Sequence, residues 1–230
     1  MKLHLPNVTL FGADTADLDR LLMAFEICLN YAEFGAMKIV ADVEADYVTK
    51  SGIQVFSSTG IKSRKDYSEF IIKGLNNYID TEFVLIAQHD GFILNPAAWD
   101  KAFLKYDYIG APWLADGDLI VGNGGFSLRS KRLLEVTQSD EQIQIGSKED
   151  DKYAENEDWV ICMILREYIE SKGITFAPVE LAKQFSIEEN EVVGGKWTNQ
   201  FGFHGLRWTD ISSWLAEHPE YPIHNPLDKV

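Results

Sequence analysis

Short apolar runs alternate with amphipathic stretches along the first ninety residues of the chain. The apolar, β-prone runs predict buried strands at Val8–Phe11, Lys38–Asp42, Ile53–Phe56 and Phe83–Ala87. Apolar residues at helical spacing predict two helices, one N-capped by Asp14 or Thr15 and one that follows Ser63. Near-continuous apolar strands that alternate with helices are typical of a mostly parallel sheet covered on both faces. The pattern therefore predicts an α/β fold.

The second half of the chain is less regular. It predicts short strands at Tyr106–Ala111, Leu119–Val121 and Phe126–Arg129, a helix near 130–137 and a long buried helix from about Asn156 to Ser171. The polar, acidic stretch 138–156 is typical of a mobile surface loop. Since no repeat or linker interrupts the pattern, we expect a single Rossmann-like domain over 1–230, with a mixed, mostly parallel sheet and helices on both of its faces.

Charge and composition exclude several classes of function. The 230 residues carry 21 Lys+Arg and 36 Asp+Glu, a formal net charge of −15, which argues against binding to nucleic acid or to anionic membranes. Cys28 and Cys162 lie in apolar contexts and are expected to be buried thiols. No apolar run approaches the ~18–20 residues of a membrane span, and the first residues lack a signal-peptide pattern. These features predict a cytoplasmic protein without a transmembrane segment.

Carboxylates follow several of the predicted strands. Asp14, Asp42 and Asp90 each come just after a strand, and ligands bind at the carboxyl ends of parallel strands. In the run Gln88-His89-Asp90-Gly91, a carboxylate beyond a central strand suits Mg²⁺ or Mn²⁺ that also holds a diphosphate. The alternative is a strand-ending turn, because Asp-Gly is a common turn pair.

Two further segments offer groups for substrate and catalysis. The glycines around Asn123, at positions 122, 124 and 125, let the backbone approach a ligand closely, although they also fit a plain hairpin. Glu157 and Asp158 open the predicted long helix, where the helix dipole alone explains acidic residues. If that helix start faces the cleft, Asp158 is a candidate general base. Adjacent helical residues point about 100° apart, so only one of the two carboxylates aims into the cleft.

His204, in Phe-Gly-Phe-His-Gly, is a candidate metal ligand, although a lone His is more often held by a backbone partner. Asp116-Gly117-Asp118 has the Asp-x-Asp form of a metal motif but fits an exposed turn, so we expect a turn there and not a metal site. The run Lys148–Asp151 is expected to be a solvated loop. Among the aromatic residues near these motifs, Trp113 is expected at the mouth of the cleft.

Taken in order, these motifs resemble a known family. They are Gln88–Ile93, Tyr106–Trp113, Gly122–Arg129, Glu157-Asp158 and Phe201–Gly205. The chain resembles, from about residue 8 to 208, a family of bacterial and fungal proteins long labelled only as a domain of unknown function and regarded as GT-A-type glycosyltransferases. The Gly-Gly-Phe-Ser run with its later Glu-Asp helix start is also similar, more distantly, to the β-1,4-galactosyltransferases.

The resemblance implies a GT-A-like fold and transfer of a sugar from a nucleotide-diphosphate sugar, such as a UDP- or GDP-sugar, to a hydroxyl of a glycan or other acceptor. It implies a nucleotide-sugar half (about 1–110), an acceptor and catalytic half (about 111–210) and a C-terminal tail (211–230). Donor and cofactor contacts are expected from Asp14, Asp42, Gln88, His89 and Asp90, and substrate contacts from Trp113, Asn123, Gly124, Gly125 and Phe126.

The resemblance also implies roles in the reaction. Asp90 and His204 would hold Mn²⁺ or Mg²⁺, and Asp158, with Glu157 beside it, would supply the base of an inverting transferase. Gln88 stands where the family carries the first Asp of Asp-x-Asp, so one charged ligand is missing and metal-independent donor binding stays open.

Two other classes remain open on the sequence alone. One is a carbohydrate-binding or degenerate transferase-like protein without catalysis, for which Gln88 is the best argument. The other is a metal-dependent phosphohydrolase, which usually needs two metals and more carboxylates at one strand end than this sequence shows.

Overall fold

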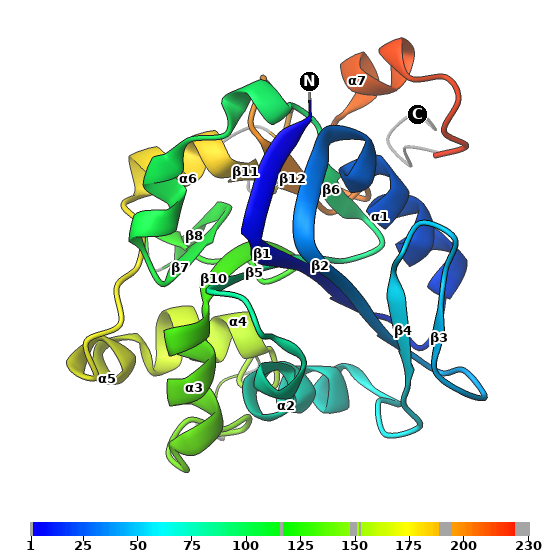
Figure 1. Cartoon of the computed structure of the whole chain (residues 1–230). Helices are drawn as coiled ribbons and strands as arrows, with labels where there is room; N and C mark the ends of the chain where they lie inside the picture. Colours follow the sequence, from blue (N-terminus) through cyan, green and yellow to red (C-terminus); the bar gives the residue numbers. More distant parts are fainter. Residues whose placement is uncertain (1, 116, 148–150, 152, 189–194, 224–230) are drawn as a thin grey trace.

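The structure is a computed structural model that describes residues 2–115, 117–147, 151, 153–188 and 195–223. The chain forms strands and helices that pack together (Figure 1), and the predicted α/β class is confirmed. The strands are β1 (Leu3–Ala13), β2 (Ala32–Ala41), β3 (Tyr47–Val48), β4 (Gln54–Ser57), β5 (Phe83–Ala87), β6 (Gly91–Ile93), β7 (Tyr108–Gly110), β8 (Pro112–Ala115), β9 (Asp118–Val121), β10 (Phe126–Ser130), β11 (Ser186–Ile187) and β12 (Gly202–His204). The helices are α1 (Leu18–Tyr31), α2 (Arg64–Lys73), α3 (Lys131–Ser139), α4 (Glu157–Trp159), α5 (Arg166–Ser171), α6 (Val179–Phe185) and α7 (Ser212–Glu217).

A mixed sheet organises the fold. In the described part of the chain it has seven strands, in the order β3-β4-β2-β1-β5-β10-β7. Its centre is parallel, because β4 pairs with β2, β2 with β1, and β1 with β5 in the same direction. β10 runs antiparallel to β5 and to β7, and β3 runs antiparallel to β4. The parallel centre brings the carboxyl ends of β1, β2 and β5 to one edge, where ligands of such sheets bind.

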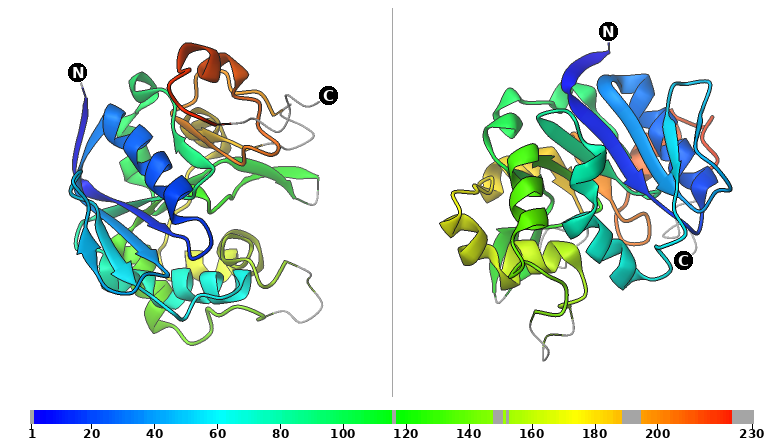
Figure 2. Two further views of the ribbon diagram at one scale, coloured as in Figure 1. Left: turned by 90° about the vertical axis from the view of Figure 1, so that its right-hand side faces the viewer. Right: turned by 60° about the horizontal axis from the view of Figure 1, so that its bottom comes forward.

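Helices cover both faces of this sheet, as the apolar strands predict. Side chains of β5 alternate between the faces: Leu85 and Ala87 pack in the core that contains α1, whereas Val84 and Ile86 pack with α2 and α3. The right-hand view of Figure 2 shows α2 and α3 in front of the sheet. A strand buried on both faces needs apolar residues at every position, which accounts for the uninterrupted run of β5.

The helix starts follow ordinary capping chemistry. The predicted helix after Ser63 is present as α2, and the Ser63 side chain caps it by accepting a hydrogen bond from the backbone N–H of Asp66. The predicted cap of the first helix is wrong. Asp17 caps α1, and Asp14 instead accepts hydrogen bonds from the backbone N–H groups of Ala16 and Asp17, in the turn that leaves β1.

The predicted long helix over 156–171 is present from Glu157 to Ser171, but it is not a continuous α-helix. A π-helical turn (Val160–Ile164) lies between α4 and α5, and the backbone N–H of Leu165 donates to the carbonyl of Val160 at 2.9 Å. Such π-helical turns are frequent at functional sites.

The segment that precedes α4 is more ordered than its composition suggests. Ile143 is fully buried, and the N–H of Gly146 donates to the carbonyl of Ala154 at 2.8 Å. The predicted surface loop over 138–156 is therefore anchored in the core at Ile143 and Ala154, while most of its other described residues are exposed. Of the charged run Lys148–Asp151, only Asp151 lies within the described residues.

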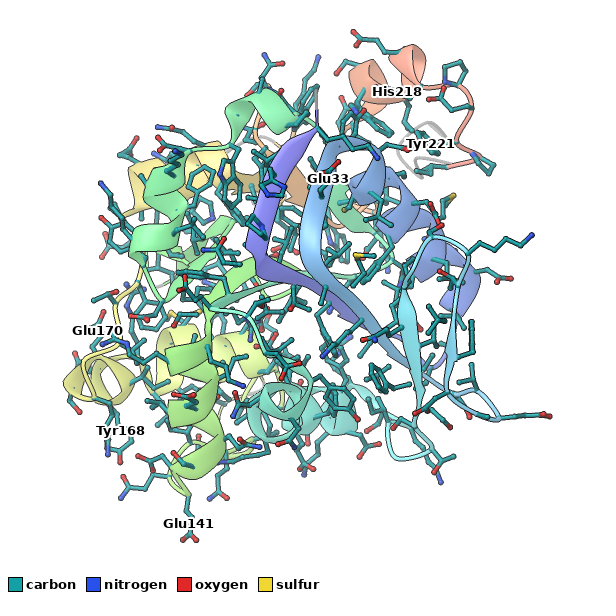
Figure 3. All side chains as sticks on the ribbon, viewed as in Figure 1. Glu33, Glu141, Tyr168, Glu170, His218 and Tyr221 are labelled. Carbon is teal, nitrogen blue, oxygen red and sulfur yellow. The ribbon has the colours of Figure 1, made fainter. Side chains whose placement is uncertain are left out.

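The described residues after 210 are packed on the core through Ile211 and Trp214 and do not form a loose tail. Trp214 of α7 is buried and packs against the ring of Phe92 at 5.6 Å. His218 and Tyr221 lie where α7 approaches the end of α1 (Figure 3), hydrogen-bonded to Tyr31 and Asn30 respectively. The prediction of a C-terminal tail over 211–230 is wrong as far as residue 223, and residues 224–230 lie outside the described part.

Two smaller β-structures flank the main sheet. β6, β12 and β11 form a short sheet, and β8 and β9 form a hairpin that leads into the glycine-rich segment. Gly117, at the hairpin turn, has a φ of 92°, which fits the predicted exposed turn, and Asp118 beside it is exposed; Asp116 lies outside the described residues.

Cys28 and Cys162 are buried free thiols, as predicted. Within the described residues, no helix has both the length and the apolar composition needed to cross a membrane.

Candidate functional site

The glycine-rich turn between β9 and β10 is the centre of the candidate site. Asn123 has a left-handed backbone (φ 52°), which asparagine tolerates better than most residues. Its side-chain oxygen accepts from the N–H of Phe126, and its carbonyl accepts from the hydroxyl of the buried Tyr108 at 2.9 Å. The turn is therefore held rigidly from both sides. Gly124 contacts Asp158, whereas Asn123 and Gly125 contact His204.

Asp158 meets this turn at Gly124. The N–H of Gly124 donates to one oxygen of Asp158 at 2.8 Å, and the N–H of Trp159 donates to the other, also at 2.8 Å. Asp158 is partly exposed, at the start of α4. Two backbone hydrogen bonds fix the orientation of the carboxylate and leave the remaining lone pairs of its oxygens for a proton or a substrate hydroxyl.

Glu157 has a different environment. It forms a bidentate ion pair with Arg129, with nitrogen–oxygen distances of 2.8 and 2.9 Å, and the two side chains are only 4% and 1% exposed. The helix start is held in addition by Ser68 of α2, whose hydroxyl accepts from the N–H of Glu157. A side chain at Gly124 would collide with the Glu157 carboxylate, so glycine is needed for this close packing. The predicted catalytic role of Glu157 does not fit this position, because both of its oxygens are taken by a buried cation.

This environment changes the proton affinity of Asp158. Burial and the neighbouring negative charge of Glu157 raise the pKa of Asp158 to about 7, against the opposing hydrogen bond from Gly124. A carboxylate with a pKa near neutrality that is held on a rigid element is suited to general acid–base chemistry.

His204 forms the other half of the site, on the far side of the turn. Its Nε2 lies 3.4 Å from Oδ1 of Asp90 and 3.1 Å from Oε1 of Gln88. A side chain at Gly125 would collide with the imidazole ring. The turn, the end of β5 and the end of β12 therefore meet at one point, as the carboxyl-end placement of Asp90 predicts.

Glu188 is a member of the site that sequence reasoning missed. It follows β11, and one of its oxygens lies 3.0 Å from Nδ1 of His204, while the other accepts from the side-chain amide of Asn123 at 2.7 Å. The parallel pairing of Ile187 with Phe203 brings Glu188 beside His204. No local pattern marks Glu188, since only this pairing of distant strands places it there.

The charges in this cluster compensate one another. Although burial opposes it, the hydrogen bonds and charges of Asp90 and Glu188 raise the pKa of His204 to about 10. Burial would raise the pKa of Asp90, but His204 lowers it to about 2. The imidazolium thus compensates one of the two negative charges that Asp90 and Glu188 bring to it.

The donor set of this cluster fits one divalent ion. Two neighbouring ligands of an octahedral ion at ~2.1 Å are about 3.0 Å apart, close to the separations of His204 Nε2 from Gln88 Oε1 (3.1 Å) and from Asp90 Oδ1 (3.4 Å). Glu188 is on the opposite ring nitrogen, where it would orient the imidazole as the outer carboxylate of a metal-bound His commonly does. Within the described residues, no three His, Cys, Asp or Glu side chains converge on a common point, so such an ion would depend on the amide oxygen of Gln88.

Asp14 and His89 lie together at the ends of β1 and β5. Nδ1 of His89 is 2.8 Å from Oδ2 of Asp14, and the side-chain amide of Gln88 donates to the hydroxyl of Tyr67 at 2.9 Å. Burial raises the pKa of Asp14, but the His89 hydrogen bond and the backbone N–H groups outweigh it and leave the pKa lowered. Asp42 is exposed after β2, at the same edge of the sheet.

Two predicted substrate contacts have contrasting positions. Trp113 of β8 is partly exposed and its indole rests on Gly122, where any side chain would collide with it. Phe126 is fully buried and stacks on Phe185 with ring centroids 5.4 Å apart. Its predicted role as a substrate contact is therefore wrong, because it faces the core side of β10.

Surface pockets of ≈590, ≈610 and ≈400 Å³ occur elsewhere on the molecule, and none contains a predicted site residue. We therefore identify the candidate site by the polar side chains that converge there and not by a pocket.

Comparison with protein families gives one match. The model of a family described as "Protein of unknown function (DUF5672)" matches residues 50–204. This span contains Gln88, Asp90, the glycine-rich turn, Asp158, Glu188 and His204. A comparison with curated proteins finds no match.

Proposed function

This chain belongs to the DUF5672 family of proteins of unknown function, and from its site we propose that it is a glycosyltransferase. It would transfer a sugar from a nucleotide-diphosphate sugar to an acceptor hydroxyl, with inversion and with metal assistance. The observation that carries the proposal is that one glycine-rich turn contacts both a candidate base and a candidate diphosphate site. Gly124 donates to Asp158, while the side chain of Asn123 lies 3.0 Å from Nδ1 of His204 and the carbonyl of Gly125 accepts from the N–H of Gln88.

Sugar transfer from a diphosphate needs these two functions close together. The acceptor hydroxyl must lose its proton as it attacks, which Asp158 is placed to accept. The leaving diphosphate carries negative charge, and a divalent ion held by Asp90, His204 and Gln88 would supply the compensating charge. Glu188 keeps the His204 ring in the orientation that presents Nε2 to Asp90.

The donor nucleotide would lie along the edge formed by Asp14, Asp42 and His89, in the GT-A-like arrangement that the motifs resemble. Ligands of doubly wound sheets bind at the carboxyl ends of the strands, and these residues follow β1, β2 and β5. The net charge of −15 does not oppose an anionic donor, because an ion at Asp90 and His204 would set the local field.

The decisive experiment is calorimetric titration with UDP and with GDP, each with and without Mn²⁺. We expect one of them to bind, more tightly with Mn²⁺, and Asp90→Asn to abolish the effect of the metal because an amide lacks the charge that a hard cation needs. Asp118→Asn is the matched control. Asp118 is exposed in the Asp-x-Asp run that is expected to be a turn, so this substitution should leave nucleotide binding unchanged. If neither nucleotide binds under any condition, the proposal is wrong.

A carbohydrate-binding protein without catalysis is the second candidate, and the missing charged ligand at Gln88 favours it. It predicts binding of free sugars with no effect of UDP, GDP or Mn²⁺. Release of nucleotide diphosphate from a panel of nucleotide sugars, measured with an enzyme-coupled assay, separates it from a transferase.

A further inference from the structure

Three aromatic rings form a row next to Asp158. Trp159 follows Asp158 in α4, and its ring centroid lies 5.7 Å from that of Trp113 and 4.9 Å from that of Tyr153. The three residues, which we call the aromatic row, come from different segments: β8, α4 and the segment before α4. The tertiary structure therefore assembles an aromatic surface directly beside the candidate base.

The row joins two parts of the molecule that extend on the same side. In the left-hand view of Figure 2, the β8–β9 hairpin and the segment between α3 and α4 both project from the body in one direction. Tyr153 is 40% exposed, and Trp113 and Trp159 are partly exposed. The indole nitrogen of Trp113 is buried without a hydrogen-bond partner among the described residues, whereas buried indole N–H groups usually have one.

Among the residues that the structure describes, the charges around the row are negative or already paired. Asp151 accepts a hydrogen bond from the indole of Trp159 at 3.1 Å, and Asp158 accepts one from the backbone N–H of Trp159 at 2.8 Å. Arg129 is buried in its ion pair with Glu157, and Lys65 lies 3.9 Å from Glu155. This surrounding repels an anionic ligand and suits an uncharged one that offers hydroxyl groups to carboxylates.

We propose that the aromatic row binds a pyranose ring of the acceptor, and that the acceptor is a neutral glycan. This inference rests on the proposed transferase function. The C–H face of a pyranose stacks on indole and phenol rings, and its peripheral hydroxyls accept from or donate to neighbouring polar groups. A sugar stacked on the row presents a hydroxyl to Asp158, on the side of the glycine-rich turn away from His204 and Asp90. The donor and acceptor sites then meet at that turn, which contacts both Asp158 and His204.

The test is binding of neutral and anionic oligosaccharides, measured by tryptophan fluorescence and calorimetry. The probes are lactose, cellobiose, maltose and N,N′-diacetylchitobiose, with 3′-sialyllactose as the anionic counterpart of lactose. We expect at least one neutral disaccharide to bind. Tyr153→Ala should weaken that binding about tenfold, the loss expected for one stacked ring.

Tyr47→Ala is the matched control. Tyr47 is 41% exposed, compared with 40% for Tyr153, but it lies on the edge strand β3, and its replacement should leave disaccharide affinity unchanged. The inference is overturned if none of the neutral disaccharides binds, if 3′-sialyllactose alone binds, or if Tyr153→Ala has no more effect than Tyr47→Ala.

Titration of the same variants with UDP, GDP and Mn²⁺ separates this inference from the proposed function. If Tyr153→Ala still binds nucleotide but no disaccharide binds, the proposed acceptor site is wrong and the transferase proposal is retained. Disaccharide binding that depends on Tyr153, without any nucleotide binding, supports the row as a pyranose site and overturns the transferase.

Discussion

Asp158 and Glu157 are adjacent in the sequence but have opposite environments in the fold. Both oxygens of Glu157 are taken by the buried Arg129, whereas Asp158 is held by two backbone N–H groups at the surface of the glycine-rich turn. Because a helix turns about 100° per residue, packing one of the two against the core directs the other outwards. The chemistry at this helix start therefore belongs to Asp158.

Replacing Asp158 by Asn should abolish transfer and preserve donor binding. The variant loses the group that accepts the acceptor proton, and we expect the rate to fall about 10²–10⁴-fold. Steady-state kinetics with a nucleotide sugar, together with calorimetry of nucleotide binding, measures both effects. If Asp158→Asn transfers sugar at the wild-type rate, the base lies elsewhere.

Glu157→Gln provides the contrast, because it leaves Arg129 buried without its counter-charge. Its free energy of unfolding should fall by about 3–5 kcal/mol in urea denaturation. A Glu157→Gln variant that is stable but inactive would contradict this structural role.

The pH dependence of Asp158 should have opposite signs in activity and in stability. Since the pKa of Asp158 is raised to about 7, the base is protonated below neutrality and kcat/KM should rise as pH increases through about 7. The folded state also binds more protons than the unfolded state between pH ~4 and about 7, so the free energy of unfolding should decrease over that interval as pH rises. Urea denaturation of wild type and Asp158→Asn at several pH values measures the second effect. Asp158→Asn should not show this decrease in the free energy of unfolding. An activity profile that is flat across neutral pH contradicts the assignment of Asp158 as the base.

At the level of elements, the turn between β9 and β10 places the two halves of the site relative to each other. Its glycines are required by close contacts: Gly124 lies against Glu157, and Gly125 lies against the ring of His204. The antiparallel pairing of β10 with β5 brings the turn next to Gln88, whose N–H donates to the carbonyl of Gly125 at 2.9 Å. The distance between base and candidate metal ligands is therefore a property of the sheet.

Gly125→Ala should displace His204 and weaken Mn²⁺ binding about 10–100-fold, the range expected when the positioning of a metal ligand is disturbed. Calorimetry with Mn²⁺ alone measures the effect, and circular dichroism verifies that the variant folds. Gly60→Ala is the control, since the nearest atom to an added methyl group there is the Ser58 hydroxyl at 3.9 Å. Equal Mn²⁺ affinity of Gly125→Ala and wild type would exclude His204 as a ligand.

On the scale of the whole molecule, the fold extends well beyond the span matched by the family. The match begins at residue 50, yet β1 and β2, which precede it, lie at the centre of the sheet. The match ends at residue 204, yet Trp214 is buried against Phe92 of β6, the strand that pairs with β12. Both ends of the described chain therefore support the elements that carry the site.

Trp214→Ala should lower the free energy of unfolding by about 3–5 kcal/mol, because it leaves a cavity where a 2% exposed indole packs. Urea denaturation measures the change. Trp208→Ala is the matched control: its side chain is 42% exposed, and its loss should cost less than about 1 kcal/mol. Similar values for the two variants would mean that α7 does not stabilise the core.

Local patterns along the chain determined the α/β class, the strand β5, the helix after Ser63 and the position of Asp14, Asp42 and Asp90 after strands. These depend on contacts within a few residues and on a strand being buried on both faces, which the order of apolar residues records. Tertiary structure alone decided that Glu188 joins His204, that Phe126 faces the core, that Trp214 belongs to the core and that a π-helical turn interrupts the long helix. Each of these outcomes depends on which distant segments pack together, and a pairing of strands separated in the chain, such as β11 with β12, leaves no periodic trace in either one.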